Sequence, residues 1–216
     1  MFNSIKNKDM RKIILIMVCL VMSLSMYGQD NDSVRIFNTI QNDITTFLGI
    51  PVTGIKSEVE SKILAKGYEW RQDRSGTKCL YGQFNGHDVA IVVVTNHDKV
   101  YRIYIQYMNA MDEGDIKREF NHLVAQFEDN ERYEKPETDQ RLGDNVDISY
   151  EMRYEHKRLV AEFYQKNKPI ETSNIKINGM CYYNKKVWFM ISEATGGYCI
   201  AMYYDNLWNM PNGEDL

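Results

Sequence analysis

The chain contains 216 residues, of which 44% are hydrophobic and 26% are charged, and its formal net charge is −4. This length predicts one domain or two small ones, with enough apolar residues to bury a core. The acidic balance excludes nucleic acid as a partner, because a protein that contacts phosphates needs a basic face.

The first 28 residues have the layout of a secretory signal peptide. A basic cluster in residues 6–12 precedes an uncharged apolar run over 13–26, and the small residues Ser25 and Gly28 are the candidate last positions before cleavage. The run is shorter than the roughly 20 residues that a membrane-spanning helix needs. We therefore expect export to the periplasm or the extracellular space, with no transmembrane segment in the mature chain.

The segment after the signal peptide changes from a helical to an extended pattern and back. Residues 30–43 carry apolar positions at the spacing of a short helix, and the β-branched and aromatic residues of 44–48 favour a strand. A further helix is expected from Ser57, with Glu60 completing a capping box, to Gly67.

Residues 68–107 follow the period of two that is typical of strands. The expected strands begin at Tyr68 and span 78–84, 89–94 and 100–107, with short turns between them. Short turns make these strands antiparallel, because a parallel connection needs a long crossover. The nearly continuous β-branched run at 89–94 predicts a central strand covered on both faces.

The second half of the chain repeats the order of helix and strands. Residues 112–128 have one apolar face and an acidic first turn, which predicts an amphipathic helix. Alternation at 148–154 and 159–163 predicts two strands, and 187–192 with 198–204 predicts a final hairpin.

These elements predict an α+β fold made of two tandem repeats. Each repeat has a helix and about four antiparallel strands, with the helices packed on one face of the sheet. The predicted boundaries are 29–110 and 111–216, and the aromatic-rich strands 100–107 and 198–205 close the two repeats. If the sheets join edge to edge, their opposite face forms one broad surface.

Several segments resemble a group of uncharacterised exported proteins of Bacteroides-type bacteria. They are FLGIPVTG, AKGYEW, YGQFNGH and DKVYRIYIQY in the first half, and KKVWFMISE, YCIAMYYDN and NGEDL in the second. The resemblance implies export and the two-repeat architecture, and it transfers no catalytic residue. The helix-plus-sheet repeat is similar in outline to the β-lactamase inhibitor protein, which is a likeness of fold alone.

The sequence carries no motif of the common catalytic or nucleotide-binding sites, so we expect no cofactor and no catalytic residues. His87 and His97 flank the expected 89–94 strand at opposite ends, about 20 Å apart, which is too far for one metal ion. The carboxylates of 139–151, among them Asp147, leave open an envelope hydrolase that uses an acidic pair.

The mature chain keeps Cys79, Cys181 and Cys199, all in apolar or aromatic segments. Burial of all three as small core residues is one interpretation. A disulfide between Cys181 and Cys199 is the candidate pairing in an oxidising compartment. Since the chain has no C-x-x-C pair, we expect no zinc site.

Aromatic residues are the more informative excess, with 15 tyrosines and three tryptophans. Tyr101, Tyr104 and Tyr107 fall on both faces of one expected strand, and Tyr203 and Trp208 lie near the C-terminus. Tyrosine is also a good strand former, which is the alternative explanation. Because tyrosine and tryptophan are favoured at interfaces, these five residues form a candidate binding surface.

The functional hypothesis is an exported, non-catalytic binding module rather than an enzyme. Its aromatic-rich sheet face would engage an unidentified protein or glycan of the cell envelope. Two alternatives remain open: a structural or assembly component of the envelope, and an envelope hydrolase of an undescribed type.

Overall fold

A computed structural model describes residues 43–72, 76–167, 170–171, 176–177 and 184–211. The predicted signal peptide, the predicted helix in 30–43 and Cys181 fall outside these residues. Contacts divide the chain into two units, and the smaller one combines 1–43 with 168–180. Its described part is the two-stranded pair β8 (Ile170–Glu171) and β9 (Lys176–Ile177). The remainder of the structural description concerns the larger unit.

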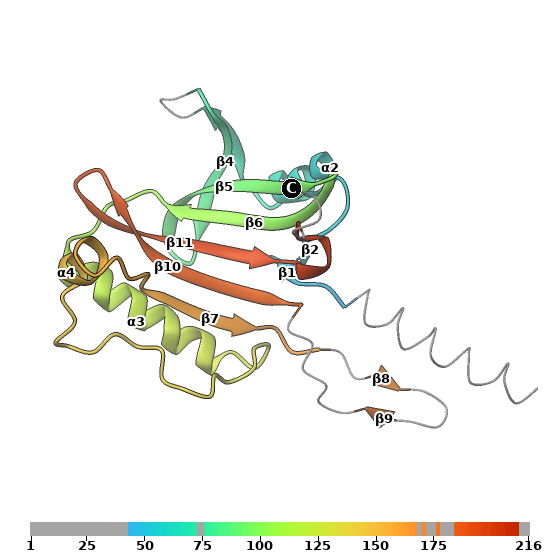
Figure 1. Ribbon diagram of the computed structural model, residues 1–216. Helices are drawn as coiled ribbons and strands as arrows, with labels where there is room; N and C mark the ends of the chain where they lie inside the picture. Colours follow the sequence, from blue (N-terminus) through green and yellow to red (C-terminus); the bar gives the residue numbers. More distant parts are fainter. Residues whose placement is uncertain (1–42, 73–75, 168–169, 172–175, 178–183, 212–216) are drawn as a thin grey trace, which may run out of the picture. The chain divides into compact units, whose positions relative to one another are not determined.

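The described residues of the larger unit form a mixed α+β structure around a seven-stranded antiparallel sheet (Figure 1). The strand order is β3-β4-β5-β6-β11-β10-β7. The strands are β3 (Glu69–Gln72), β4 (Lys78–Phe84), β5 (His87–Asn96), β6 (Lys99–Tyr107), β7 (Val160–Tyr164), β10 (Lys186–Ala194) and β11 (Gly197–Asp205). A separate pair, β1 (Thr46–Phe47) and β2 (Ile50–Pro51), precedes the first helix of this unit. The α+β class and the antiparallel sheet predicted from the sequence are confirmed.

One face of the sheet is covered by helices and contains the core. The pairing register places alternate buried residues of neighbouring strands opposite one another, as in the pairs Ile91 with Ile105 and Met202 with Phe189. Helix α2 (Lys56–Leu64) contributes Val59 to this core. Helix α3 (Glu113–Asp129) covers the half of the sheet that holds β10 and β11. We call this side of the sheet the covered face and the other side the open face.

The two long helices begin in different ways. In α3, the side chain of Asp112 accepts a hydrogen bond from the backbone N–H of Asp115, so the expected acidic first turn is confirmed. In α2, the helix begins at Lys56 after Ile55, and no side chain caps it. The capping box predicted at Ser57 is therefore wrong, because the hydroxyl lies within the first turn rather than before it.

The predicted strand at 148–154 is wrong, because Ile148–Arg153 forms the short helix α4. Two side chains bind its first backbone N–H groups: Glu113 accepts from Ile148 at 2.7 Å, and Asp147 accepts from Tyr150 at 2.7 Å. Tyr150 and Tyr154 then stack on the exposed side of this turn, 5.7 Å between ring centroids. Residues 150 and 154 fit an i, i+4 helical spacing as well as an alternating one.

The run at 89–94 is an inner strand of the sheet, as predicted, but only one of its faces is fully covered. Val89, Ile91 and Val93 are buried, whereas Val92 and Val94 are half-buried on the open face. The expectation of burial on both faces is therefore wrong.

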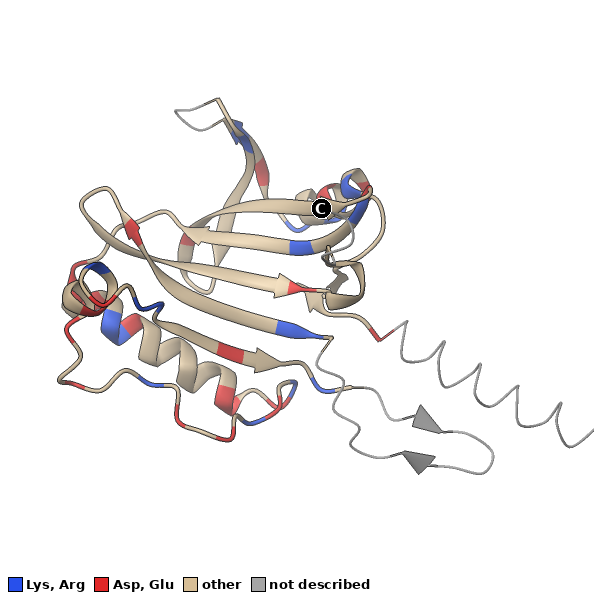
Figure 2. Cartoon of the chain, in the orientation of Figure 1, with Lys and Arg blue, Asp and Glu red and all other residues tan. Residues whose placement is uncertain are grey.

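Figure 2 shows acidic and basic residues scattered over the helices and loops, with few along the strands. Among the described residues, no helix has the length and apolar character to span a membrane.

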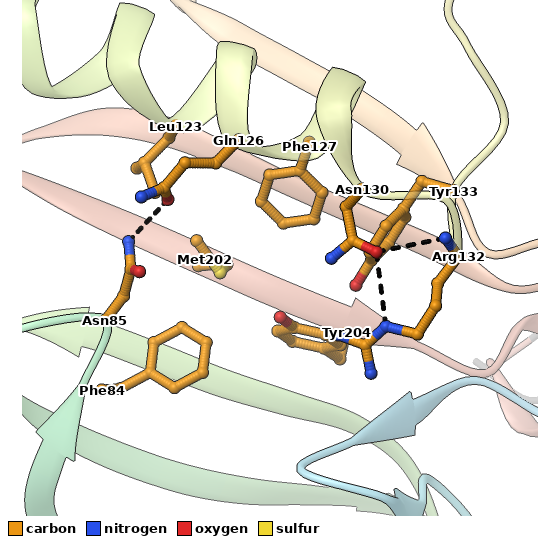
Figure 3. A pocket seen from close by; sticks show the side chains of 10 residues that line it. All are labelled: Phe84, Asn85, Leu123, Gln126, Phe127, Asn130, Arg132, Tyr133, Met202 and Tyr204. Carbon is orange, nitrogen blue, oxygen red and sulfur yellow. Dashed lines mark hydrogen bonds between the residues drawn. The ribbon is translucent and has the colours of Figure 1, made fainter.

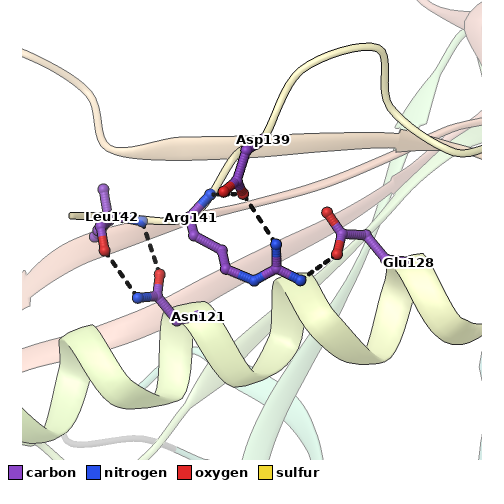
Figure 4. Close-up of polar contacts among 5 residues, drawn as sticks. All are labelled: Asn121, Glu128, Asp139, Arg141 and Leu142. Atoms are coloured by element: carbon purple, nitrogen blue, oxygen red, sulfur yellow. Dashed lines mark hydrogen bonds and ion pairs between the residues drawn. The ribbon is translucent and has the colours of Figure 1, made fainter.

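The polar loop after α3 is tied to the protein at both of its sides. Asn121 of α3 exchanges two hydrogen bonds with the backbone of Leu142, at 2.9 and 2.8 Å (Figure 4). Gln140 makes the same reciprocal pair with the backbone of Glu162, in the edge strand β7. The loop therefore occupies part of the free hydrogen-bonding edge of the sheet, which natural sheets commonly protect in this manner.

Candidate functional site

Three aromatic residues stand side by side across the middle of the open face. Tyr104 of β6 lies opposite Tyr203 of β11, and Tyr203 lies opposite Trp188 of β10. The ring centroids of Tyr104 and Tyr203 are 5.1 Å apart, and those of Tyr203 and Trp188 are 3.9 Å apart with an angle of 11° between the rings. We call Tyr104, Tyr203 and Trp188 the aromatic row.

A buried ion pair anchors the aromatic row at one side. The Arg102 side chain donates two hydrogen bonds to the Asp205 carboxylate, at 2.6 and 2.8 Å. The indole Nε1–H of Trp188 donates to the same carboxylate at 2.8 Å. The Asp205 side chain is only 2% exposed, so its charge is compensated almost entirely by these donors. The hydrogen bond between Asp205 and Arg102 is the main reason why the pKa of the Arg102 guanidinium is raised above its usual value.

Arg102 also joins the ion pair to the rings. Its guanidinium carbon lies 5.0 Å from the centroid of Tyr203 and 5.5 Å from that of Trp188, which is within the range of cation–π attraction. Burial raises the pKa of Tyr104 to about 12, and the neighbouring Tyr203 acts in the same direction. The hydroxyls of the aromatic row therefore remain neutral at physiological pH.

The orientation of the rings decides which of their surfaces a partner can touch. When two rings on adjacent strands stack, each ring covers one face of the other. Tyr203 lies between Tyr104 and Trp188: one of its faces stacks on Trp188, and its ring is tilted by 39° against that of Tyr104. What remains for a partner is mainly ring edges, the Tyr104 hydroxyl and the side of Trp188 next to Lys186, whose ammonium lies 5.7 Å from the indole centroid.

Polar contacts on the open face continue on both sides of the aromatic row. The Tyr104 hydroxyl donates to the Gln106 side chain at 3.0 Å, and Gln106 in turn donates to the Cys199 sulfur at 3.5 Å. Lys186 pairs with Glu162 of the edge strand at 2.6 Å. The charges of Lys186 and Arg102 thus both have carboxylate partners within the protein.

The structure brings together only part of the surface that the sequence predicted. Tyr104 and Tyr203 are in contact, whereas Tyr107 is 2% exposed and belongs to the covered face, where its ring stacks on His87. Tyr101 lies at an irregularity in the pairing of β5 with β6 and is half-buried. Trp208 lies in the 3-10 turn Leu207–Asn209 after β11 and is 49% exposed. Tyr107 is therefore in the wrong place for the predicted surface.

Sequence reasoning missed Trp188, Arg102 and Asp205, although each leaves a signal. Arg102 is the one charged residue of the segment VYRIYIQY, and Asp205 is the one charged residue of YCIAMYYD. A single charge in an otherwise apolar strand is costly unless it is paired. Complementary single charges in two similar strands are therefore a signal that the two strands pair.

The sequence also offered the cysteines and the acidic residues of 139–151 as candidates, and the structure places them as follows. Cys79 and Cys199 are both buried, and the pairing of Cys199 with Cys181 stays a prediction. Of the acidic 139–151 segment, Asp139 binds Arg141, which also pairs with Glu128 (Figure 4). Within the described ranges, no group of three or more His, Cys, Asp or Glu side chains is placed to hold a metal ion.

No family model, no curated protein and no solved structure matches this chain. The open face must therefore be interpreted from its own geometry. It presents closely packed Tyr, Trp and Arg side chains whose charges are paired within the protein, and this arrangement suits contact with a partner better than proton transfer.

Proposed function

We propose that the protein is an exported, non-catalytic binding module that engages a protein of the cell envelope through its open face. The observation that carries this proposal is the aromatic row held by the Arg102–Asp205 pair. Tyr, Trp and Arg are the residue types enriched among the energetic centres of protein interfaces. Rings that are already fixed by stacking lose little conformational entropy when a partner binds.

A protein partner fits the ring geometry better than a glycan does. A sugar packs its C–H groups against an open aromatic face, because the faces of the π-system are electron-rich. Tyr203 and Trp188 each use one face in their mutual stack, and the Tyr104 ring leans against Tyr203 at an angle of 39°. Ring edges, hydroxyls and the side of Trp188 beside the Lys186 ammonium remain, and this mixture matches the mixed apolar, polar and charged surface of a protein.

Export to the periplasm or the extracellular space is part of the same proposal. It is supported by the basic and apolar pattern of residues 1–28 and by the resemblance to exported proteins of Bacteroides-type bacteria. Mass spectrometry of the N-terminus of the protein from an envelope fraction tests it. A new N-terminus after Ser25 or Gly28 is the expected result, and an intact first segment would contradict export by cleavage.

We further propose that the chain consists of two tandem repeats, as in the β-lactamase inhibitor protein. The support is the strand order of the sheet. The strands β4-β5-β6 of one half are followed by β11-β10-β7 of the other, so the last strand of each half lies at the centre. In each half a helix, α2 or α3, precedes the strands of the large sheet, and the last strands of the halves, β6 and β11, pair with each other. The aromatic row crosses this junction, so residues of both halves contribute to it.

The binding proposal is tested by affinity capture from an envelope extract with matched variants. The Tyr104→Ala, Tyr203→Ala double variant removes two rings of the aromatic row. The control is Tyr150→Ala, Tyr154→Ala, which removes a stacked and exposed tyrosine pair at the C-terminal end of α4. We expect the wild type and the control to capture the same protein, and the double variant to lose it, with all three equally folded by circular dichroism.

Equal capture by the double variant and the wild type would overturn the proposed surface. Light scattering of the purified protein adds the second criterion. Self-association that is lost in the double variant would support an assembly component of the envelope instead of a module for a separate partner.

A further inference from the structure

A separate cavity of about 160 Å³ lies on the covered side of the sheet, at the C-terminal end of α3. Its apolar wall consists of Phe84, Leu123, Phe127, Met202 and Tyr204 (Figure 3). Of these, Leu123 and Phe127 project from α3, whereas Met202 and Tyr204 project from β11. The cavity is thus formed where the helix and the sheet diverge, and it shares no residue with the aromatic row.

The size of the cavity limits what it can accept. A protein cavity of about 150 Å³ with aliphatic and aromatic walls binds benzene. Thus, a single six-membered ring or a branched chain of similar volume fits the apolar wall. A larger molecule, or one with polar groups along its whole length, would leave unsatisfied groups against Phe84 and Leu123.

One end of the cavity supplies hydrogen-bond donors. The Oδ1 atom of Asn130 accepts from the backbone N–H of Arg132 at 3.1 Å and from its Nε at 3.4 Å. Since Oδ1 faces Arg132, the amide nitrogen of Asn130 points away from it, toward the cavity (Figure 3). Arg132 carries its guanidinium beside the Tyr204 ring at the same end.

The charge of Arg132 has no carboxylate within ion-pair distance among the residues that the structure describes. Arg102, by contrast, pairs with Asp205, Arg141 with Glu128 and Asp139, and Arg153 with Glu193. The Arg132 guanidinium is therefore a cation at the mouth of a cavity with one apolar wall, and within the described part of the chain no carboxylate competes with a ligand for its terminal N–H groups.

The opposite end of the cavity carries two amides that are joined by a hydrogen bond. The Asn85 side chain donates to the Gln126 carbonyl oxygen at 2.8 Å, and the Gln126 amide nitrogen lies 2.8 Å from the His122 ring. Burial raises the pKa of Tyr204, while the charge of Arg132 acts in the opposite direction, which agrees with a guanidinium close to this hydroxyl. The polarity of the cavity therefore runs one way, with the donors at the Arg132 end.

We propose that this cavity binds a small organic monocarboxylate with an apolar body about the size of one six-membered ring. The carboxylate is held by Arg132 and the amide nitrogen of Asn130, and the body packs against Phe127 and Met202. A carboxylate matches the planar fork of a guanidinium, which can donate two parallel hydrogen bonds to it.

The test is a titration of the full chain with benzoate, followed by chemical-shift changes, and a parallel titration with benzamide, its neutral counterpart of nearly equal size. We expect saturable benzoate binding with a dissociation constant below about 10 mM. Even a modest binding free energy per ligand atom gives an affinity of this size. Benzamide and the Arg132→Gln variant should each bind about tenfold more weakly, which is the size of one lost charged hydrogen bond.

Arg118→Gln is the matched control, because Arg118 is an exposed arginine of α3 that pairs with Asp115 away from the cavity. It should bind benzoate as the wild type does, and Arg132→Lys should fall between wild type and Arg132→Gln. The proposal is overturned by equal affinities for benzoate and benzamide, by an unchanged affinity in Arg132→Gln, or by no saturable binding at about 10 mM benzoate. None of these results depends on the open face.

Discussion

Phe189 and Trp188 are neighbours in β10 and point to opposite faces of the sheet. On the covered face, Phe189 is fully buried and packs edge to face on Phe120 of α3, with ring centroids 5.1 Å apart. On the open face, Trp188 is half-buried, stacks on Tyr203 and donates a hydrogen bond to Asp205. Phe189 is thus held by apolar packing, whereas Trp188 is held by stacking and by a hydrogen bond to a charged group.

This difference suggests what each face is for. Apolar packing under a helix excludes water and supplies most of the stability of a domain. Rings at a surface that water reaches need fixed polar partners if they are to keep one orientation. On the open face a nearly buried ion pair fixes the orientation of rings that the core does not require. We interpret this as preorganisation for a partner.

The largest effect should come from the covered face. We expect Phe189→Ala to lower the free energy of unfolding by about 3–5 kcal/mol, because the substitution leaves a cavity in a closely packed core. Urea denaturation followed by circular dichroism measures this loss. A loss below about 1 kcal/mol would mean that the ring is not closely packed.

The ion pair of the open face should give the next largest effect. We expect Asp205→Asn to cost about 2–3 kcal/mol, less than a fully buried pair, because Arg102 keeps some contact with water. Glu162→Gln is the control, since its partnership with Lys186 is more exposed, and it should cost less than about 1 kcal/mol in the same denaturation experiment. Equal losses in the two variants would contradict the anchoring role of Asp205.

A smaller effect is expected for Trp188→Phe. This change keeps a ring against Tyr203 and removes the Nε1–H donor to Asp205, so we expect a loss of about 1 kcal/mol in the free energy of unfolding. In the Asp205→Asn background, the same substitution should cost less, because the charge-assisted bond is already weakened. Strictly additive losses would show that the indole and the carboxylate are not coupled.

The smallest effect concerns pH. The folded protein raises the pKa of Tyr104 from 10.0 to about 12, so this group favours the folded state below pH 10 and loses that contribution as the pH rises toward 12. We expect Tyr104→Phe to weaken the alkaline loss of stability relative to wild type. Denaturation at a series of alkaline pH values measures it, and parallel curves for the two proteins would contradict the buried state of this phenol.

Much of the fold could be predicted from the sequence, because hydrophobic period is a local property. The strand at 78–84 and the helix that begins after Asp112 follow directly from alternation and from an acidic cap. The short helix α4 could not be predicted, since six residues do not distinguish the two periods and the decision lies with Glu113, a residue distant in the sequence. The tandem repeats stay a prediction.

The candidate site was harder to predict, because it depends on register between distant strands. Alternation places Tyr104 and Tyr107 on opposite faces, but it does not tell which face the helices cover. The contact of Arg102 with Asp205 joins residues about a hundred positions apart and requires that β6 and β11 pair in this register. The stack on Trp188 requires, in addition, the register of β10.

The most direct test of the open face is site-specific photo-crosslinking in cells that produce the protein. A benzophenone amino acid at position 160, an exposed site of β7, reports on neighbours of the sheet, and the same group at position 154, directly after α4, is the reference. We predict one discrete protein adduct from position 160 that disappears when Tyr203→Ala is added, and no such adduct from position 154. Identical adducts from both positions, or an adduct that persists with Tyr203→Ala, would contradict the assignment of the aromatic row as a binding surface.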